Sequence, residues 1–319
     1  MTLYEQFGLG HDLGSSHGAS RIIRKAYPDA FFTELMLEAY PLWRDLETAC
    51  GQTLYRECGL AYFGDRDSPN LRDLTEGLQK LKVPHEILDS EKARFLLPHL
   101  KLAKSEVAIF TPEAGWVDAG STVGALLRLC DAAGVRHKEA KVSSVDLLEQ
   151  AFDRVVLAVG SWIKQFVNLD VKVSLQTFAY LDDISAEGPV WIEDSLDNAY
   201  GFPTEPEGQG IKVALHSLGP EINPDETNRR PYLPHLTRLL DVCRTRFDLE
   251  HATLSRAKGC LYTNTHDEGF RYGELGPKTV WISACSGHGF KFGLWSGRLI
   301  ANLAEGIEPS TKIRDAFRR

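Results

Sequence analysis

Two short segments near the C-terminus carry side chains suited to chemistry. Cys260 begins the first, and the second runs from Cys285 to Phe292, with a glycine-rich turn that holds His288 and Lys291. Apolar residues recur at helical spacing from Phe290 to Ala304, so this turn is predicted to open a helix. Its backbone N–H groups and the positive helix end would then face whatever lies above them, and an electron-rich ring carbonyl suits that place.

A third segment, Gly14 to Arg24, gathers three basic side chains at the other end of the chain. His17, Arg21 and Arg24 lie within it. An anionic ligand needs cationic donors, and arginine offers the bidentate geometry that a carboxylate prefers. Because two arginines at i and i+3 flank Ile22 and Ile23, a surface ion pair that closes a sheet edge is the alternative for Arg24.

These segments together resemble the monomeric sarcosine oxidase family of D-amino-acid-oxidase-like flavoproteins, which includes N-methyltryptophan oxidase and L-pipecolate oxidase. The motifs G-S-[SH]-H-G-x-[ST]-R-x-[IF]-R, C-x-Y-[TK]-x-T-x-D-E-x-F and S-G-H-G-F-K occur in the family's order. The likeness runs from Leu3 to about Gly306. It implies an FAD enzyme, with FAD joined covalently to Cys260, a bond that needs a thiol of lowered pKa beside positive charge.

The resemblance also assigns roles to individual residues. Arg24 and Lys291 would hold the acid group of an amino-acid substrate, while His17 and Arg21 would lie against the flavin ring and tune its electronics. The turn residues Ser286, Gly287, His288 and Gly289 would contact the cofactor.

The predicted strand from Gly210 to His216 adds a cation and an imidazole. Alternation places Lys212, Ala214 and His216 on one face. By the resemblance this face looks toward the flavin, with Lys212 assisting oxygen reduction, His216 beside the substrate amine and Tyr200 lining the same pocket. From the residues alone, a solvated edge strand is the alternative.

The G-x-G-x-x-G turn expected of a dinucleotide-binding unit is not found in this sequence. Such a unit has a strand, a G-x-G-x-x-G turn and a helix, with an acidic residue about 20 positions on that holds the ribose. Glu5, in the strand predicted from Thr2 to Phe7, takes the acidic position, so the first βα unit is expected to be missing. The glycines from Gly8 to Gly14 fail the pattern because the last one is late and no crossover helix follows.

A second cofactor contact is predicted where a strand enters a glycine turn. The segment from Asp153 to Trp162 is typical of a buried parallel strand followed by a turn at Gly160. The alternative is a plain βα turn, with Trp162 packed in the core.

Composition is that of a globular protein and excludes several classes. The chain has 319 residues, 43% hydrophobic and 25% charged, with a net charge of -8 and no basic stripe, which argues against nucleic acid. No apolar run approaches the roughly 20 residues that span a bilayer, and no signal peptide is visible, so a cytoplasmic location is expected. The six cysteines show neither a disulfide framework nor metal-ligand spacing.

The predicted fold is mixed α/β, with a Rossmann-like FAD-binding domain interleaved with an antiparallel-sheet substrate domain. Helices are expected at 31–50, 68–81, 90–95 (capped by Ser90) and 118–133, and strands at 60–63, 174–181, 190–193, 199–202 and 211–218. The FAD-binding domain is assigned to 1–58, 113–174 and 255–319, and the substrate domain to 59–112 and 175–254.

The predicted function is oxidation of a secondary or N-methyl amino acid, sarcosine by default, to an imine, with O₂ reduced to hydrogen peroxide by a monomeric enzyme. L-Pipecolate is the rival substrate, because the segment from Gly14 to Tyr27 looks closer to the pipecolate oxidase version. A catalytically silent homologue that does not hold FAD is the alternative from another class.

Overall fold

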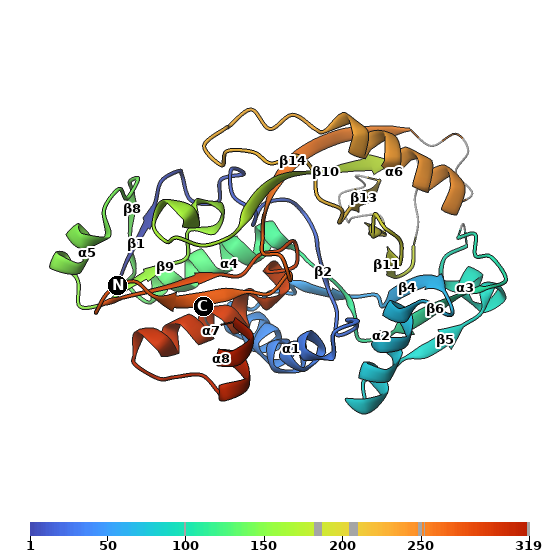
Figure 1. The fold of residues 1–319 in the computed structure, drawn as a ribbon, viewed down its shortest axis with the longest axis horizontal. Helices are drawn as coiled ribbons and strands as arrows, with labels where there is room; N and C mark the ends of the chain where they lie inside the picture. Colours follow the sequence, from blue (N-terminus) through green and yellow to red (C-terminus); the bar gives the residue numbers. More distant parts are fainter. Residues whose placement is uncertain (99, 182–186, 204–209, 248–250, 252, 318–319) are drawn as a thin grey trace.

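The structure is a computed structural model of the chain, and it describes all residues except 99, 182–186, 204–209, 248–250, 252 and 318–319. Figure 1 shows a large sheet that extends from the long strands β10 and β14 to β5 at one end of the molecule. Smaller sheets and the helices α1, α7 and α8 lie beside it.

The large sheet has eight strands in the order β14-β10-β13-β12-β11-β4-β6-β5. All neighbours are antiparallel except β11 and β4, which are parallel. The strands are β4 (Leu60–Asp65), β5 (Glu86–Leu88), β6 (Glu106–Thr111), β10 (Lys172–Leu181), β11 (Val190–Glu193), β12 (Ala199–Gly201), β13 (Ile211–Leu215) and β14 (Leu254–Asn264). The strands expected between positions 174 and 218 are therefore confirmed, although β12 and β13 end earlier than expected.

Three smaller sheets complete the strand pairing among the described residues. One is the parallel pair β1 and β8, one has the order β15-β16-β9, and one has the order β2-β7-β3. Their strands are β1 (Thr2–Glu5), β2 (Arg21–Ile23), β3 (Tyr55–Glu57), β7 (Gly115–Val117), β8 (Arg136–Glu139), β9 (Val155–Leu157), β15 (Arg271–Glu274) and β16 (Thr279–Ser283).

Strand β9 corrects one expectation. It pairs in parallel with β16, as predicted, but it lies at the edge of its sheet. Val155 and Leu157 are buried, whereas Val156 is 44% exposed. The strand is therefore covered on one face only, so a run of valines did not indicate burial on both faces.

The helices follow the apolar spacing closely. They are α1 (Ala30–Cys50), α2 (Pro69–Lys80), α3 (Ser90–Leu96), α4 (Ala119–Ala132), α5 (Val145–Ala151), α6 (Leu233–Arg246), α7 (Gly293–Ala304) and α8 (Thr311–Phe317), with 3₁₀ turns η1 (Gly160–Gln165) and η2 (Phe290–Phe292). The predicted cap of α3 is wrong: Asp89, not Ser90, accepts from the Lys92 N–H, because Ser90 is already helical. None of the described helices is long and apolar enough to cross a membrane.

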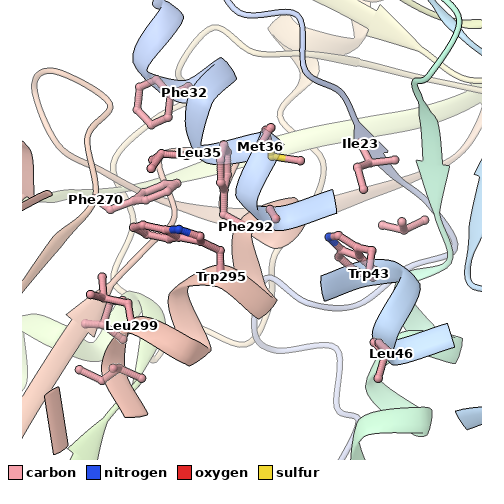
Figure 2. Close-up of a cluster of buried hydrophobic side chains, with 14 of the residues drawn as sticks. Ile23, Phe32, Leu35, Met36, Trp43, Leu46, Phe270, Phe292, Trp295 and Leu299 are labelled. Carbon is pink, nitrogen blue, oxygen red and sulfur yellow. The ribbon is translucent and has the colours of Figure 1, made fainter. Parts of the chain in front are cut away.

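The largest core cluster joins α1 to the C-terminal helices. Figure 2 shows Phe32, Leu35 and Met36 of α1 facing side chains that include Phe292 and Trp295. The indole N–H of Trp43 donates to the Lys291 carbonyl at 2.8 Å. This packing fixes η2, and with it the backbone that carries Lys291.

The two interleaved domains remain a prediction at the boundaries given above. Strands from both assigned domains share the large sheet, because β14 pairs along its length with β10. Cys260 lies in this pairing, opposite Gln176.

Candidate active site

One cavity of about 1550 Å³ collects the residues singled out from the sequence. All of them line it except Ser286, namely Glu5, His17, Arg21, Arg24, Gly160, Trp162, Tyr200, Lys212, His216, Cys260, Gly287, His288, Gly289 and Lys291. Ser286 is 2% exposed, and its hydroxyl lies 3.3 Å from the Thr265 backbone N. Its side chain therefore fastens the turn from behind and does not face the cavity.

Arg24 and Lys291 form a cationic end of this cavity, with Tyr27 between them. The Arg24 guanidinium lies 4.0 Å from the centre of the Tyr27 ring, and Lys291 Nζ lies 5.7 Å from it. Burial holds the pKa of Lys291 well below its usual range, and Arg24 and Arg21 lower it further. Within the described residues Arg24 does not form a surface ion pair, which was the alternative interpretation, because its guanidinium stacks on the buried ring of Tyr27.

Lys212 is buried in the interior of the large sheet, on β13 between β10 and β12. Its ammonium group donates to the Ser20 carbonyl at 3.0 Å and to the Ser20 hydroxyl at 3.2 Å. The rings of Phe178 and Phe202 lie 4.8 and 4.9 Å away. The alternative of a solvated edge strand is therefore wrong.

Cys260 lies among cations, as the resemblance implies, but its thiol differs from the expectation. Burial raises the pKa of the thiol, while Arg21, Lys212 and Arg229 act in the opposite direction. In the protein alone the burial effect is larger, so the expected lowered pKa is wrong.

Arg21 and His17 belong to a tight loop that continues into β2. Arg21 donates to the carbonyls of Ser20 at 2.8 Å, Ser15 at 3.0 Å and His17. Burial and the charge of Arg21 lower the pKa of His17 to about 4, so the imidazole is neutral at pH 7. Its Nε2 is buried and has no hydrogen-bond partner among the residues that the structure describes, which leaves a polar atom for a ligand to satisfy.

Two positions of the turn that carries His288, Gly287 and Gly289, require glycine. Gly287 has φ of 73°, and a Cβ there would lie 2.3 Å from a Tyr262 ring carbon and 2.7 Å from a His216 ring carbon. A Cβ on Gly289 would lie 1.8 Å from the Ala284 carbonyl oxygen. The predicted helix after this turn is confirmed, but its α-helical part begins only at Gly293, after η2. Gly293 and Gly297 of α7 line the cavity.

Glu5, Gly160 and Trp162 lie at another part of the cavity wall. Glu5 ends β1, and its Oε1 accepts from the Phe7 N–H at 3.1 Å and lies 3.4 Å from His11 Nε2. Gly160 has φ of 53° and begins η1. Trp162 donates to Asp225 at 2.7 Å and is 7% exposed, so it both packs in the core and borders the cavity.

Three further residues of the cavity wall were assigned no role from the sequence: Tyr27, Tyr262 and Glu268. The Tyr200 and Tyr262 hydroxyls lie 3.2 Å apart, and Tyr27 stacks on Arg24. Glu268 Oε1 lies 3.4 Å from His216 Nε2. Tyr262 and Glu268 stand inside the motif that begins at Cys260, so position in that motif was the available signal.

Comparison with known families identifies the protein class. A model described as FAD dependent oxidoreductase (DAO) matches residues 1–303. The chain belongs to this FAD-dependent oxidoreductase family. The oxidoreductase is 30% identical to human peroxisomal sarcosine oxidase over 97% of this chain and 86% of that protein. It is 29% identical to monomeric sarcosine oxidase of Streptomyces avermitilis, over 94% and 86% of the two chains.

Solved structures agree on the fold of this oxidoreductase. NikD, titled an unusual amino acid oxidase essential for nikkomycin biosynthesis, superposes with a TM-score of 0.83 at 23% identity, over 98% of this chain and 90% of that one. L-Proline dehydrogenase from P. horikoshii gives 0.79 at 17% identity, over 95% and 87%. The predicted mixed α/β fold and the predicted family are confirmed.

The residues present fit an FAD group. The cavity exceeds the roughly 300–1,000 Å³ of a drug-sized ligand pocket, so it has room for a dinucleotide together with a small substrate. Gly287 and Gly289 have no side chains, so the backbone itself forms this part of the cavity wall. The unpartnered His17 Nε2 and the N-terminal residues of α7 add polar groups that a flavin ring could satisfy.

Proposed function

We propose that this oxidoreductase oxidises a secondary or N-methyl amino acid, with sarcosine as the reference substrate. The product is an imine that water hydrolyses, and O₂ is reduced to hydrogen peroxide. For sarcosine the balance is sarcosine, O₂ and water giving glycine, formaldehyde and hydrogen peroxide. The names of the relatives support the amino-acid class and sarcosine as the reference substrate, and the cavity supports a substrate that carries a carboxylate.

The buried Lys291 beside Arg24 is the observation that carries this proposal. Both cations line the cavity, and no anionic partner of Lys291 Nζ is found within the part of the chain that the structure describes. A substrate carboxylate would supply that partner, bidentate to Arg24 and paired with the point charge of Lys291. Fixing the acid group orients the C–H bonds next to the amine nitrogen.

The residues proposed to hold FAD are Glu5 and Gly160 for the nucleotide part, and Gly287, His288 and Gly289 for the ring. Bound FAD supplies the redox chemistry, taking two electrons from the amine and passing them to O₂. His17 and Arg21 would lie against the ring, where a neutral imidazole and a fixed guanidinium set the local field. Aromatic walls at Tyr27 and Tyr62 border the substrate end and exclude water.

Lys212 is proposed to serve the oxygen half-reaction. Its ammonium group is held by Ser20 and enclosed by two phenylalanine rings. A fixed positive charge in such a dry place stabilises negative charge that develops on oxygen. His216, on the same face, is proposed to lie beside the substrate amine.

We further propose that FAD is attached covalently through Cys260. The Cys260 sulfur would replace one hydrogen of the flavin 8α-methyl group, and the two electrons released would pass to O₂. The positive charges of Arg21 and Lys212, which lower the pKa of this thiol against the effect of burial, are proposed to stabilise the thiolate that forms the bond.

Acid precipitation tests this attachment. The precipitated wild-type protein should stay yellow, whereas Cys260→Ser should release its flavin into the supernatant. Cys285→Ser is the matched control, because Cys285 lines the same cavity, and its pellet should stay yellow. A colourless wild-type pellet would contradict the covalent bond, and a protein that takes up no flavin at all would contradict the proposed function.

A substrate screen tests the function itself. Hydrogen peroxide formation would be followed with sarcosine, other N-methyl amino acids and L-pipecolate, each against its N-acetylated form. Sarcosine turnover with no signal from N-acetylglycine is the expected result. A preference for L-pipecolate would replace the reference substrate, and a flavin-loaded protein that oxidises none of them would overturn the proposal. We also propose a monomer, to be checked by light scattering.

A further inference from the structure

Glu268 holds its backbone in a disfavoured conformation beside the cavity. Its φ is 57° although it is not glycine. The neighbouring Gly269 N–H donates to Asp267 at 3.0 Å, and His288 Nε2 lies 3.0 Å from the Glu268 carbonyl oxygen. Burial and the Lys291 charge lower the pKa of His288 to about 3, so this imidazole is neutral and its Nε2–H donates to that carbonyl. Strain that is held in place by such contacts often marks a functional position.

Glu268 also differs from the other acidic side chains that line the cavity. Among the described residues these are Glu5, Asp29, Asp267 and Glu268. Glu5 accepts from Phe7 N–H and lies near His11, and Asp29 caps α1 by accepting from Phe31 N–H at 2.8 Å. Asp267 holds Arg271 through two bonds of 2.6 and 2.7 Å. Each of these three is thus engaged in holding the fold.

The Glu268 carboxylate is placed differently. Its side chain is 63% exposed and lies 3.4 Å from His216 Nε2. The bond to His216 holds the pKa of Glu268 below its usual range, and the positive charge of Arg24 acts the same way. The carboxylate is therefore ionised at neutral pH, within the field of the cation proposed to bind the substrate acid.

An amino acid at neutral pH carries a negative and a positive group on adjacent atoms. Arg24 and Lys291 are proposed to bind the negative carboxylate. A cavity that offered only cations would repel the positive amino group. We propose that Glu268, together with His216, is the anionic subsite that recognises the cationic amino group of the substrate, so that the enzyme selects zwitterionic amino acids over simple carboxylates. This inference rests on the proposed function.

The test compares two ligands that differ in charge at one atom. Methylthioacetate keeps the carboxylate of sarcosine and has neutral sulfur in place of nitrogen; for a cyclic substrate, the ring-oxygen analogue serves. In FAD-loaded Glu268→Gln the KM for the amino acid should rise about tenfold or more, while the Ki of the neutral analogue stays within about twofold. Glu268→Asp keeps the negative charge on a shorter side chain, so its KM for the amino acid should lie between those of wild type and Glu268→Gln.

Two controls separate recognition from a structural effect. Glu305→Gln removes the same charge at an exposed position after α7 and should change neither constant. Thermal melting of Glu268→Gln shows whether the turn is disturbed, and a structural role would weaken both ligands equally. Equal weakening, or an unchanged KM, overturns the inference alone. A flavin-loaded wild type that oxidises no amino acid but binds the analogue overturns the proposed function, and the inference with it.

Discussion

Lys291 is kept in the fold against an energetic cost. A buried ammonium group beside two arginines prefers to lose its proton, and its pKa in the folded state lies well below the unfolded value. For a base lowered in this way, folding becomes less favourable as the pH falls below the unfolded pKa. At pH 7 the free protein therefore carries a cost that a bound carboxylate would remove.

Replacing Lys291 by methionine should separate binding from stability. Methionine has a similar length and no charge, so we expect Lys291→Met to raise the substrate KM at least about tenfold, in line with the loss of a charged hydrogen bond. The melting temperature of the ligand-free protein should stay equal or rise. A lower melting temperature in Lys291→Met would show that the lysine stabilises the free fold, contrary to this account.

At the scale of elements, the turn before α7 depends on glycine more than α7 itself does. Gly287 combines a positive φ with two close ring neighbours, whereas a Cβ on Gly297 would meet nothing within 4 Å. The same change at the two positions should therefore have opposite effects.

Gly287→Ala should destabilise the ligand-free protein by roughly 1–3 kcal/mol. Gly297→Ala, inside a helix, should stabilise it by roughly 0.5–1 kcal/mol. Denaturant unfolding of the two variants measures both changes. If Gly287→Ala unfolds at the wild-type midpoint, Tyr262 and His216 can move aside, and the wall of the cavity is softer than the packing indicates.

Patterns in short stretches of the sequence predicted individual helices, strands and turns, but they did not predict which of these elements contact one another. The helix expected at 118–133 and the turn at Gly160 follow from the residues at those positions, and the structure adds that Asp118 is the N-cap of this helix. The pairing of β11 with β4 joins segments far apart in the chain, as does the contact of His216 with Glu268. The raised pKa of Cys260 depends on burial by several elements. None of these is encoded in a short window.

For the whole molecule, buried neutral histidine links the cavity to acid stability. His288 is 8% exposed and packs against Phe32, Phe270 and Phe292. Its pKa falls from 6.5 to about 3. The unfolded chain thus binds a proton that the folded protein does not, and stability is lost as the pH falls below about 6.5.

Replacing His288 by phenylalanine should make the fold less sensitive to acid. Wild type should lose roughly 2–3 kcal/mol more than His288→Phe between pH 7 and pH 4.5. Urea unfolding at both pH values measures this difference. An equal loss in the two proteins would mean that another group, such as His17, dominates the acid response.

Trp43 gives the molecule an optical property as well as a structural one. Its indole N–H holds the Lys291 carbonyl, and its side chain borders the cavity. A tryptophan so close to a light-absorbing cofactor transfers its excitation energy instead of emitting it. Trp43 therefore both anchors the Lys291 backbone and carries a fluorescence that should fall when FAD fills the cavity.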